Sequence, residues 1–221
     1  MNPALTAPIG VYGGTFDPVH EAHLRTAMEV AVALDVVDFR MVPAGIPPHR
    51  ASPFASAADR VAMLRLAIRE CPALSVDERE VRRAGPSWMV TTLESLRAEN
   101  PHAPLLLVIG QDAANGLDRW HEWRKLFAYA HLVVMTRPGE IPEYHGELKE
   151  ELAPRLTANP ADLRLAARGR VYIQPVSPMN TSSTGIRASL KAGTPTVKGL
   201  PPAVFDYIMR HQLYGTGHTT T

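Results

Sequence analysis

Short runs of apolar residues alternate along the chain with segments in which apolar residues recur every three or four positions. A continuous run is typical of a strand covered on both faces, whereas the wider spacing is typical of a helix with one buried side. The runs predict strands at residues 9–12, 36–42, 74–81, 105–109, 131–135 and 171–174. The spacing predicts helices at residues 24–34, 57–68, 87–100, 117–129, 184–192 and 202–213.

Strand and helix predictions follow one another in turn, which indicates an α/β fold with a largely parallel sheet. We expect a single domain over residues 1–221, with residues 1–8 and 215–221 as tails, because no repeat or linker divides the chain. Residues 140–168 are charged and interrupted by prolines, so we expect one helix there, lying at the surface. Serines predict two helix starts, by a capping box at Ser56 and an N-cap at Ser182 or Ser183.

The composition is that of an ordinary globular protein, with 45% hydrophobic and 20% charged residues. The formal net charge is only +1, from 23 basic and 22 acidic residues, which gives no support for nucleic acid as a partner but allows a small phosphorylated ligand. The single cysteine, Cys71, excludes an intrachain disulfide and suits a reducing compartment. The first eight residues lack a secretory pattern, and no apolar stretch reaches the ~18 residues of a membrane span. We therefore expect a cytoplasmic protein with no membrane partner, and the sequence predicts no oligomeric state.

The segment from Gly13 to His23, GGTFDPVHEAH, joins the first predicted strand to the first predicted helix. Two glycines allow close approach of a ligand, and the helix start that follows offers free N–H groups and a partial positive charge to a phosphate. His20 and His23 are three residues apart and share a face of that helix. Paired imidazoles at this place can hydrogen-bond the charge on a phosphorus during transfer. The alternative is that one histidine caps the helix and the other fills a crevice.

A second helix start, Thr181-Ser-Ser-Thr-Gly-Ile-Arg187, gathers hydroxyl groups one turn before an arginine. The planar guanidinium of Arg187 suits phosphate oxygens. A simple serine cap is the alternative interpretation of this segment. Together with the first turn, it predicts the other side of a polyphosphate site.

Both segments together resemble the nucleotidyltransferase superfamily with the H-x-G-H signature, and the chain closely resembles its bacterial nicotinate-nucleotide adenylyltransferases. The resemblance runs from about Gly10 to Tyr214. Further matching segments are Pro47-Pro-His-Arg50, Pro86-Ser-Trp-Met-Val-Thr-Thr-Leu93, Ile109-Gly-Gln-Asp112, Trp120-His-Glu-Trp123, Arg137-Pro-Gly139 and 200–208. The resemblance implies a Rossmann-like open, mostly parallel sheet with helices on both faces.

The resemblance also implies adenylyl transfer from ATP to nicotinate mononucleotide, giving deamido-NAD and pyrophosphate, with Mg²⁺ bound mainly through the ATP phosphates. Catalytic roles fall on His20, His23 and Arg187. ATP-binding roles fall on Gly13, Gly14, Thr15, Phe16, Arg50, Asp112, Ser182, Ser183 and Thr184. Mononucleotide-binding roles fall on Ser87, Trp88, Met89, Trp120 and His121, with Trp120 stacked on the nicotinate ring and Trp123 in the core. No protein ligand to a metal is implied.

The chain departs from the family pattern at three places: Ala22 stands where glycine is usual, Arg50 where lysine is frequent, and Trp88-Met89 where Tyr-Thr is usual. The first change predicts a small local shift around a bound adenosine. Nicotinamide mononucleotide or phosphopantetheine as the acceptor stays open as an alternative, and so does a nucleotide-binding module without chemistry. The Trp120-His-Glu-Trp123 segment favours nicotinate over phosphopantetheine, and the presence of both histidines favours an enzyme.

Overall fold

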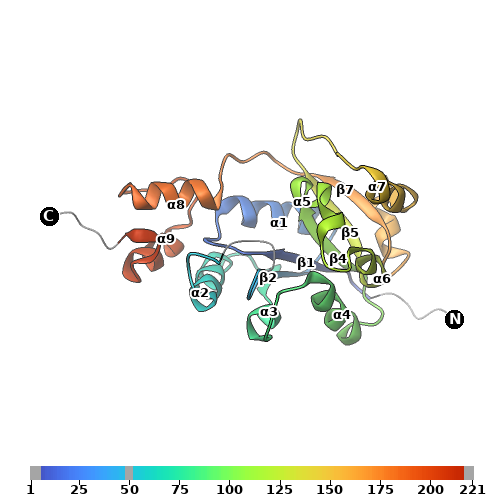
Figure 1. Ribbon diagram of the computed structural model, residues 1–221, viewed down its shortest axis with the longest axis horizontal. Helices are drawn as coiled ribbons and strands as arrows, with labels where there is room; N and C mark the ends of the chain where they lie inside the picture. Colours follow the sequence, from blue (N-terminus) through green and yellow to red (C-terminus); the bar gives the residue numbers. More distant parts are fainter. Residues whose placement is uncertain (1–5, 48–51, 217–221) are drawn as a thin grey trace.

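A computed structural model describes residues 6–47 and 52–216. Within them, seven parallel strands form one open sheet in the order β3-β2-β1-β4-β5-β7-β6. This arrangement confirms the predicted α/β class and the open parallel sheet (Figure 1). The strands are β1 Ile9–Gly14, β2 Asp38–Pro43, β3 Leu74–Val76, β4 Leu105–Gly110, β5 His131–Thr136, β6 Leu156–Thr157 and β7 Val171–Pro175.

The order of the strands reverses between β1 and β4. From β1 the chain builds outward through β2 to β3, and from β4 it builds the other way through β5 to β7. β1 pairs with both inner neighbours, with Ile9 opposite Asp38 on one side and opposite Leu105 on the other. Open α/β sheets bind ligands at the carboxyl ends of the strands beside such a reversal. The segments that follow Gly14 and Gly110 therefore lie where a ligand is expected.

Helices cover both faces of the sheet, as predicted. In β4 the side chains of Leu105 and Leu107 pack on one face, and those of Leu106 and Val108 on the other. The face of Leu106 meets α1 Glu21–Ala33, α2 Ala57–Ala67, α8 Ser183–Lys191 and α9 Pro202–Arg210. The face of Leu105 meets α4 Met89–Glu99, α5 Gln111–Asn115, α6 Leu126–Tyr129 and α7 Gly146–Leu152. In Figure 1, α9 lies beside α2 at one end of the molecule, and α8 lies on the other side of α9.

Serine side chains begin two of the helices. Ser182 accepts a hydrogen bond from Gly185 N at the start of α8, as predicted, and Gly193 follows the helix with a φ of +70°. Only the first half of the capping box predicted at Ser56 is present. Ser56 Oγ accepts from Asp59 N, but the Asp59 carboxylate accepts from the serine hydroxyl instead of reaching back to the Ser56 backbone.

The single helix predicted over residues 117–129 is wrong. Two short 3₁₀ turns, η1 Leu117–Arg119 and η2 Trp123–Lys125, precede α6. Between them Trp120 is extended, with ψ of 146°, and Glu122 has a φ of +49°. Each turn buries one apolar side chain, Leu117 in η1 and Trp123 in η2. The apolar spacing therefore continues through the segment, and spacing alone predicts one continuous helix.

Residues 140–168 are more ordered and more buried than predicted. They contain α7, the 3₁₀ turns η3 Ala153–Arg155 and η4 Pro160–Arg164, and the edge strand β6, which the sequence did not predict. Leu148, Leu152 and Leu163 are buried, so this segment is not confined to the surface. The many charges around these three leucines conceal their apolar spacing.

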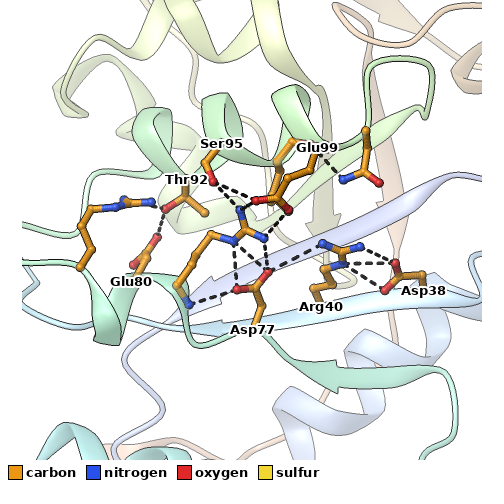
Figure 2. A network of polar contacts seen from close by, with 11 residues as sticks. Asp38, Arg40, Asp77, Glu80, Thr92, Ser95 and Glu99 are labelled. Carbon is orange, nitrogen blue, oxygen red and sulfur yellow. Dashed lines mark hydrogen bonds and ion pairs between the residues drawn. The ribbon is translucent and has the colours of Figure 1, made fainter.

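A polar network joins β2, β3 and α4 through the short helix α3 Arg79–Arg82 (Figure 2). Arg79 forms ion pairs with Asp77 and with Glu99, and Arg40 forms one with Asp38. These residues line a cavity of about 640 Å³. The charges in it already pair with one another, and none of the predicted site residues lines it. We therefore assign this network to the packing of α3 and α4 on the sheet edge.

Candidate active site

The turn after β1 is tightly packed. The chain leaves Gly14, passes through Phe16 with a φ of +50°, and enters α1 at Glu21. A Cβ atom at Gly13 would lie 2.4 Å from Cε of Met89, and one at Gly14 would lie 2.8 Å from the Phe16 ring. A side chain at Gly14 would therefore displace the buried Phe16 ring, whereas at Gly13 only the flexible end of Met89 would have to move. The contact at Gly13 also brings the predicted mononucleotide segment against the predicted ATP turn.

His20 and His23 lie face to face at the start of α1. Their ring centroids are 3.7 Å apart and their planes differ by 21°. His20 N donates a hydrogen bond of 3.3 Å to His23 Nδ1, so the proton of a neutral His23 ring is on Nε2. His20 occupies the N-cap position of α1, and the hydrogen bond from its backbone N–H to His23 Nδ1 is the returning half of a capping box. The alternative that a histidine caps this helix thus agrees with the position of His20.

The environment keeps His20 uncharged. Its side chain is buried, and Nδ1 has no hydrogen-bond partner among the described residues. Burial, together with the positive charge of Arg137, lowers the pKa of His20 to about 4. His20 is therefore a neutral imidazole whose Nδ1 is both buried and without a partner among the described residues. Arg137 belongs to a segment that the sequence singled out, but its influence on His20 was not predicted.

Aromatic rings surround His23. The Phe16 ring lies 5.1 Å from it in an edge-to-face arrangement, and the Tyr12 ring lies 6.3 Å from it. Burial raises the pKa of Tyr12 to about 12, so its phenol stays protonated. These rings restrict the orientation of His23 and exclude water from one side of it.

The start of α8 meets the first turn directly. Arg187 Nη1 donates a 2.7 Å hydrogen bond to the backbone oxygen of Asp17, and Ser183 Oγ donates one of 3.0 Å to the backbone oxygen of Pro18. Arg187 Nη2 also donates to Thr184 Oγ1 at 3.2 Å. The partners are 165 and 170 residues apart in the chain. The two helix starts that were predicted separately therefore lie against each other.

Asp17 holds this junction together, a role that sequence reasoning missed. Its buried carboxylate accepts hydrogen bonds from Phe54 N at 2.7 Å, Ala55 N at 3.1 Å and the Tyr214 hydroxyl at 2.7 Å. The signal that could have found it is an acidic residue within an otherwise apolar and small-residue turn. Its partners, at positions 54, 55 and 214, carry no matching signal.

Arg60 is the second residue that was missed. It is 1% exposed, donates to Thr15 O at 2.8 Å and to Gly45 O at 3.2 Å, and leaves Nε without a partner among the described residues. Burial lowers the pKa of Arg60, and the charge of Asp17 opposes that change. An arginine on the apolar face of the predicted helix, next to Val61 and Leu64, was the available signal.

Two of the predicted mononucleotide residues lie side by side. The Trp88 and His121 rings have centroids 4.5 Å apart, although one residue is the N-cap of α4 and the other lies in the loop after η1. Ser87 Oγ accepts a 2.8 Å hydrogen bond from Gly45 N and so fixes the chain before α4. Trp120 is partly buried against the core, and Trp123 is buried, which confirms the prediction that Trp123 belongs to the core.

Two other predicted residues are placed less closely. Asp112 is exposed on α5, directly after the end of β4. Arg50 lies outside the described residues. Ala22, one of the departures from the family pattern, is buried in the first turn of α1.

Among residues 6–47 and 52–216, no group of three or more His, Cys, Asp or Glu side chains is arranged to hold a metal ion. No helix in this part of the chain is long and apolar enough to cross a membrane.

An open parallel sheet with two helix starts meeting beside its strand reversal is typical of Rossmann-like nucleotide-binding proteins. The comparison with known families agrees with this class. Residues 11–189 match the cytidylyltransferase-like family, so the chain is a member of that family. Relatives narrow the assignment. The chain is 47% identical to a probable nicotinate-nucleotide adenylyltransferase of Aeromonas hydrophila, over 95% of this chain and 98% of the relative. A protein of Methylococcus capsulatus with the same description is 42% identical over 93% and 99%. The chain belongs to the nicotinate-nucleotide adenylyltransferase family.

A solved structure has the same fold. The nicotinic acid mononucleotide adenylyltransferase of Plasmodium falciparum, determined in complex with NaAD, superposes with a TM-score of 0.69. The match covers 95% of this chain and 98% of that one at 16% sequence identity. This likeness supports the Rossmann-like architecture.

Proposed function

We propose that the chain transfers the adenylyl group of ATP to the phosphate of nicotinate mononucleotide, which gives deamido-NAD and pyrophosphate in a step of NAD biosynthesis. The names of its relatives support this reaction. The observation that carries the proposal is the junction of the α1 and α8 starts, with two stacked imidazoles on one side and Arg187 on the other. That junction offers donors for both ends of a triphosphate.

His20 and His23 would bind the phosphate that is transferred. The attacking mononucleotide phosphate is already an anion, so the reaction needs positioning and charge stabilisation rather than a strong base. His23 can donate from Nε2 because its Nδ1 accepts from the backbone. His20, neutral in the free protein, can donate a hydrogen bond from a ring N–H to an oxygen of the phosphate that is transferred.

Arg187 would hold the leaving pyrophosphate together with Ser182, Ser183 and Thr184 at the α8 start. A helix N-terminus with hydroxyl groups and a guanidinium is well suited to phosphate oxygens. Gly13, Gly14, Thr15 and Phe16 would line the ATP side of the first turn, and Arg50 would assist with the same oxygens. Asp112, at the end of β4, would contact nucleotide hydroxyls.

The mononucleotide would bind on the α4 side of the first turn. Trp120 would stack on the nicotinate ring, and Ser87, Trp88, Met89 and His121 would line the rest of the subsite. The 4.5 Å separation of the Trp88 and His121 rings and the contact of Met89 with Gly13 support this grouping. A mononucleotide on this side would have its phosphate directed at the paired histidines.

We propose that Mg²⁺ is bound together with the triphosphate of ATP. It binds phosphate and water oxygens with few protein ligands, and when bound it would neutralise charge on the leaving group. We further propose that the protein acts in the cytoplasm on small molecules and without a nucleic-acid or membrane partner.

A pyrophosphate-release assay tests the function. The purified chain is given ATP, Mg²⁺ and one acceptor at a time: nicotinate mononucleotide, nicotinamide mononucleotide or phosphopantetheine. We expect release with nicotinate mononucleotide and identification of deamido-NAD by mass spectrometry. If pyrophosphate is released only with another acceptor, that acceptor is the substrate instead of nicotinate mononucleotide. If no acceptor gives release, the proposed function is wrong.

A further inference from the structure

Phe54 is a large apolar side chain with 74% of its surface exposed, yet its backbone is firmly held. Phe54 N donates a 2.7 Å hydrogen bond to one oxygen of the buried Asp17 carboxylate, and Ala55 N donates to the other at 3.1 Å. Hydrogen bonds to a buried carboxylate are among the stronger ones in proteins. The position of Phe54 is therefore tied to the first turn of the site.

The Phe54 ring lies against the guanidinium of Arg187. The guanidinium carbon is 4.4 Å from the ring centroid, which is the geometry of a cation–π contact. Arg187 also donates to the backbone oxygen of Asp17 at 2.7 Å. One residue, Asp17, thus fixes the aromatic ring through its side chain and the guanidinium through its backbone.

This arrangement orients Arg187 and leaves most of its hydrogen-bond donors available to a ligand. Its two hydrogen bonds within the described part of the chain, to Asp17 O and Thr184 Oγ1, engage two of the five N–H donors of a guanidinium. The ring covers one face and limits the rotamers of a long side chain. A side chain that is ordered before the ligand arrives loses less conformational entropy on binding.

We propose that Phe54 is a positioning residue for Arg187, which prepares the guanidinium for the pyrophosphate half of ATP. The proposal rests on the function proposed above, because it assigns Arg187 to the leaving phosphates. It differs from a structural role, since Phe54 is exposed and contributes little to the core. The loss of Phe54 should therefore weaken the binding of ATP and leave the binding of nicotinate mononucleotide unchanged.

The decisive measurement is a comparison of Michaelis constants. In Phe54→Ala we expect KM for ATP to rise about 2–5-fold, the range of one cation–π contact at an exposed place. In the reverse direction, KM for pyrophosphate should rise by a similar factor. KM for nicotinate mononucleotide, KM for deamido-NAD and kcat should stay within experimental error of the wild-type values.

Two further variants make the result specific. Phe54→Tyr keeps an aromatic face and should restore the wild-type KM for ATP. Leu165→Ala removes an apolar side chain of similar exposure, 79%, from the segment around η4, and should change no constant. Both truncations remove exposed side chains, so all three variants should have wild-type melting temperatures.

The outcomes separate this inference from the proposed function. If the wild-type chain makes no deamido-NAD, the proposed function fails and the inference with it. If the wild-type chain is active and Phe54→Ala has unchanged constants for ATP and pyrophosphate, only the positioning role is overturned. An equal rise in the constants for both substrates, or no recovery in Phe54→Tyr, would also overturn it.

Discussion

Stacked histidines place two very different imidazoles side by side. His20 is buried and has a pKa of about 4, whereas His23 has its tautomer set by a backbone N–H. Because His20 is neutral, the two rings can approach closely without the repulsion that two imidazolium rings would have. The binding of a phosphate between or beside them would raise the pKa of His20 from its value in the free protein.

Removal of His23 should slow the proposed reaction. In His23→Ala we expect kcat to fall by ~10²–10³-fold, the usual loss when one transition-state donor is deleted. The measurement is pyrophosphate release at saturating substrates, with His102→Ala, which changes an exposed histidine in the turn before β4, as the control. Near-normal turnover in His23→Ala would take His23 out of the mechanism.

The low pKa of His20 also predicts a pH dependence of stability. An unfolded chain would protonate this histidine near pH 6.5 and the folded chain only near pH 4, so unfolding takes up a proton between these values. The free energy of unfolding should therefore be fully retained above pH ~6.5 and fall as the pH is lowered toward 4, by at most ~1.4 kcal/mol per pH unit from this group.

Chemical denaturation of the wild type and of His20→Gln at a series of pH values measures this contribution. The buried His131 also has a pKa lowered by burial and adds a slope in both proteins, so the difference between the two isolates His20. Identical slopes would show that His20 does not titrate as expected.

At the scale of the element, sequence predictability follows from how many independent signals agree. The α8 helix has a serine cap, an apolar spacing and a glycine stop, and its predicted start and end are nearly correct. Residues 117–129 have the spacing alone, and the left-handed backbone at Glu122 divides them. The edge strand β6 spans only two residues, too short for an alternation to be recognised.

Gly45 tests how closely the loop after β2 packs. A Cβ atom there would lie 2.3 Å from the backbone oxygen of Glu80, which cannot move aside like a side chain. We expect Gly45→Ala to lower the melting temperature by several degrees, as overpacking costs ~1–3 kcal/mol. Gly110→Ala, with nothing within 4 Å of the new methyl group, should melt near the wild-type temperature. Equal melting temperatures for both variants would mean that the loop after β2 shifts to make room for the new methyl group, so that the packing at Gly45 is not tight.

At the scale of the whole molecule, the sequence predicted the α/β class and the open parallel sheet, and it singled out the two helix starts that the fold brings into contact. It did not predict the contacts that join distant parts. Nothing in the local pattern pairs Asp17 with Tyr214, since these residues meet only after the sheet has formed. Arg60 was missed for the same reason, because its partners are backbone oxygens at Thr15 and Gly45.

The contact between Tyr214 and Asp17 should stabilise the whole chain. We expect Tyr214→Phe to lower the free energy of unfolding by about 1–3 kcal/mol, because a buried carboxylate loses a hydrogen bond. Tyr207→Phe is the matched control, since that hydroxyl donates to Asp59 on α2 in a more exposed setting, and its loss should cost less. Urea denaturation measures both, and a larger loss in Tyr207→Phe would contradict the central role of Asp17.

The junction of α1 with α8 has a consequence for the newly made protein. A ribosome that has completed every strand of the sheet has not yet released the α8 start, because Ser183–Arg187 follow β7 in the chain. The nascent polypeptide can thus form its sheet while the proposed nucleotide site is still unfinished. Capture of ATP would then be one of the last events of synthesis, and a chain cut short after β7 would contain the α1 side of the proposed site but neither the α8 start nor the helices that complete the cover of one sheet face.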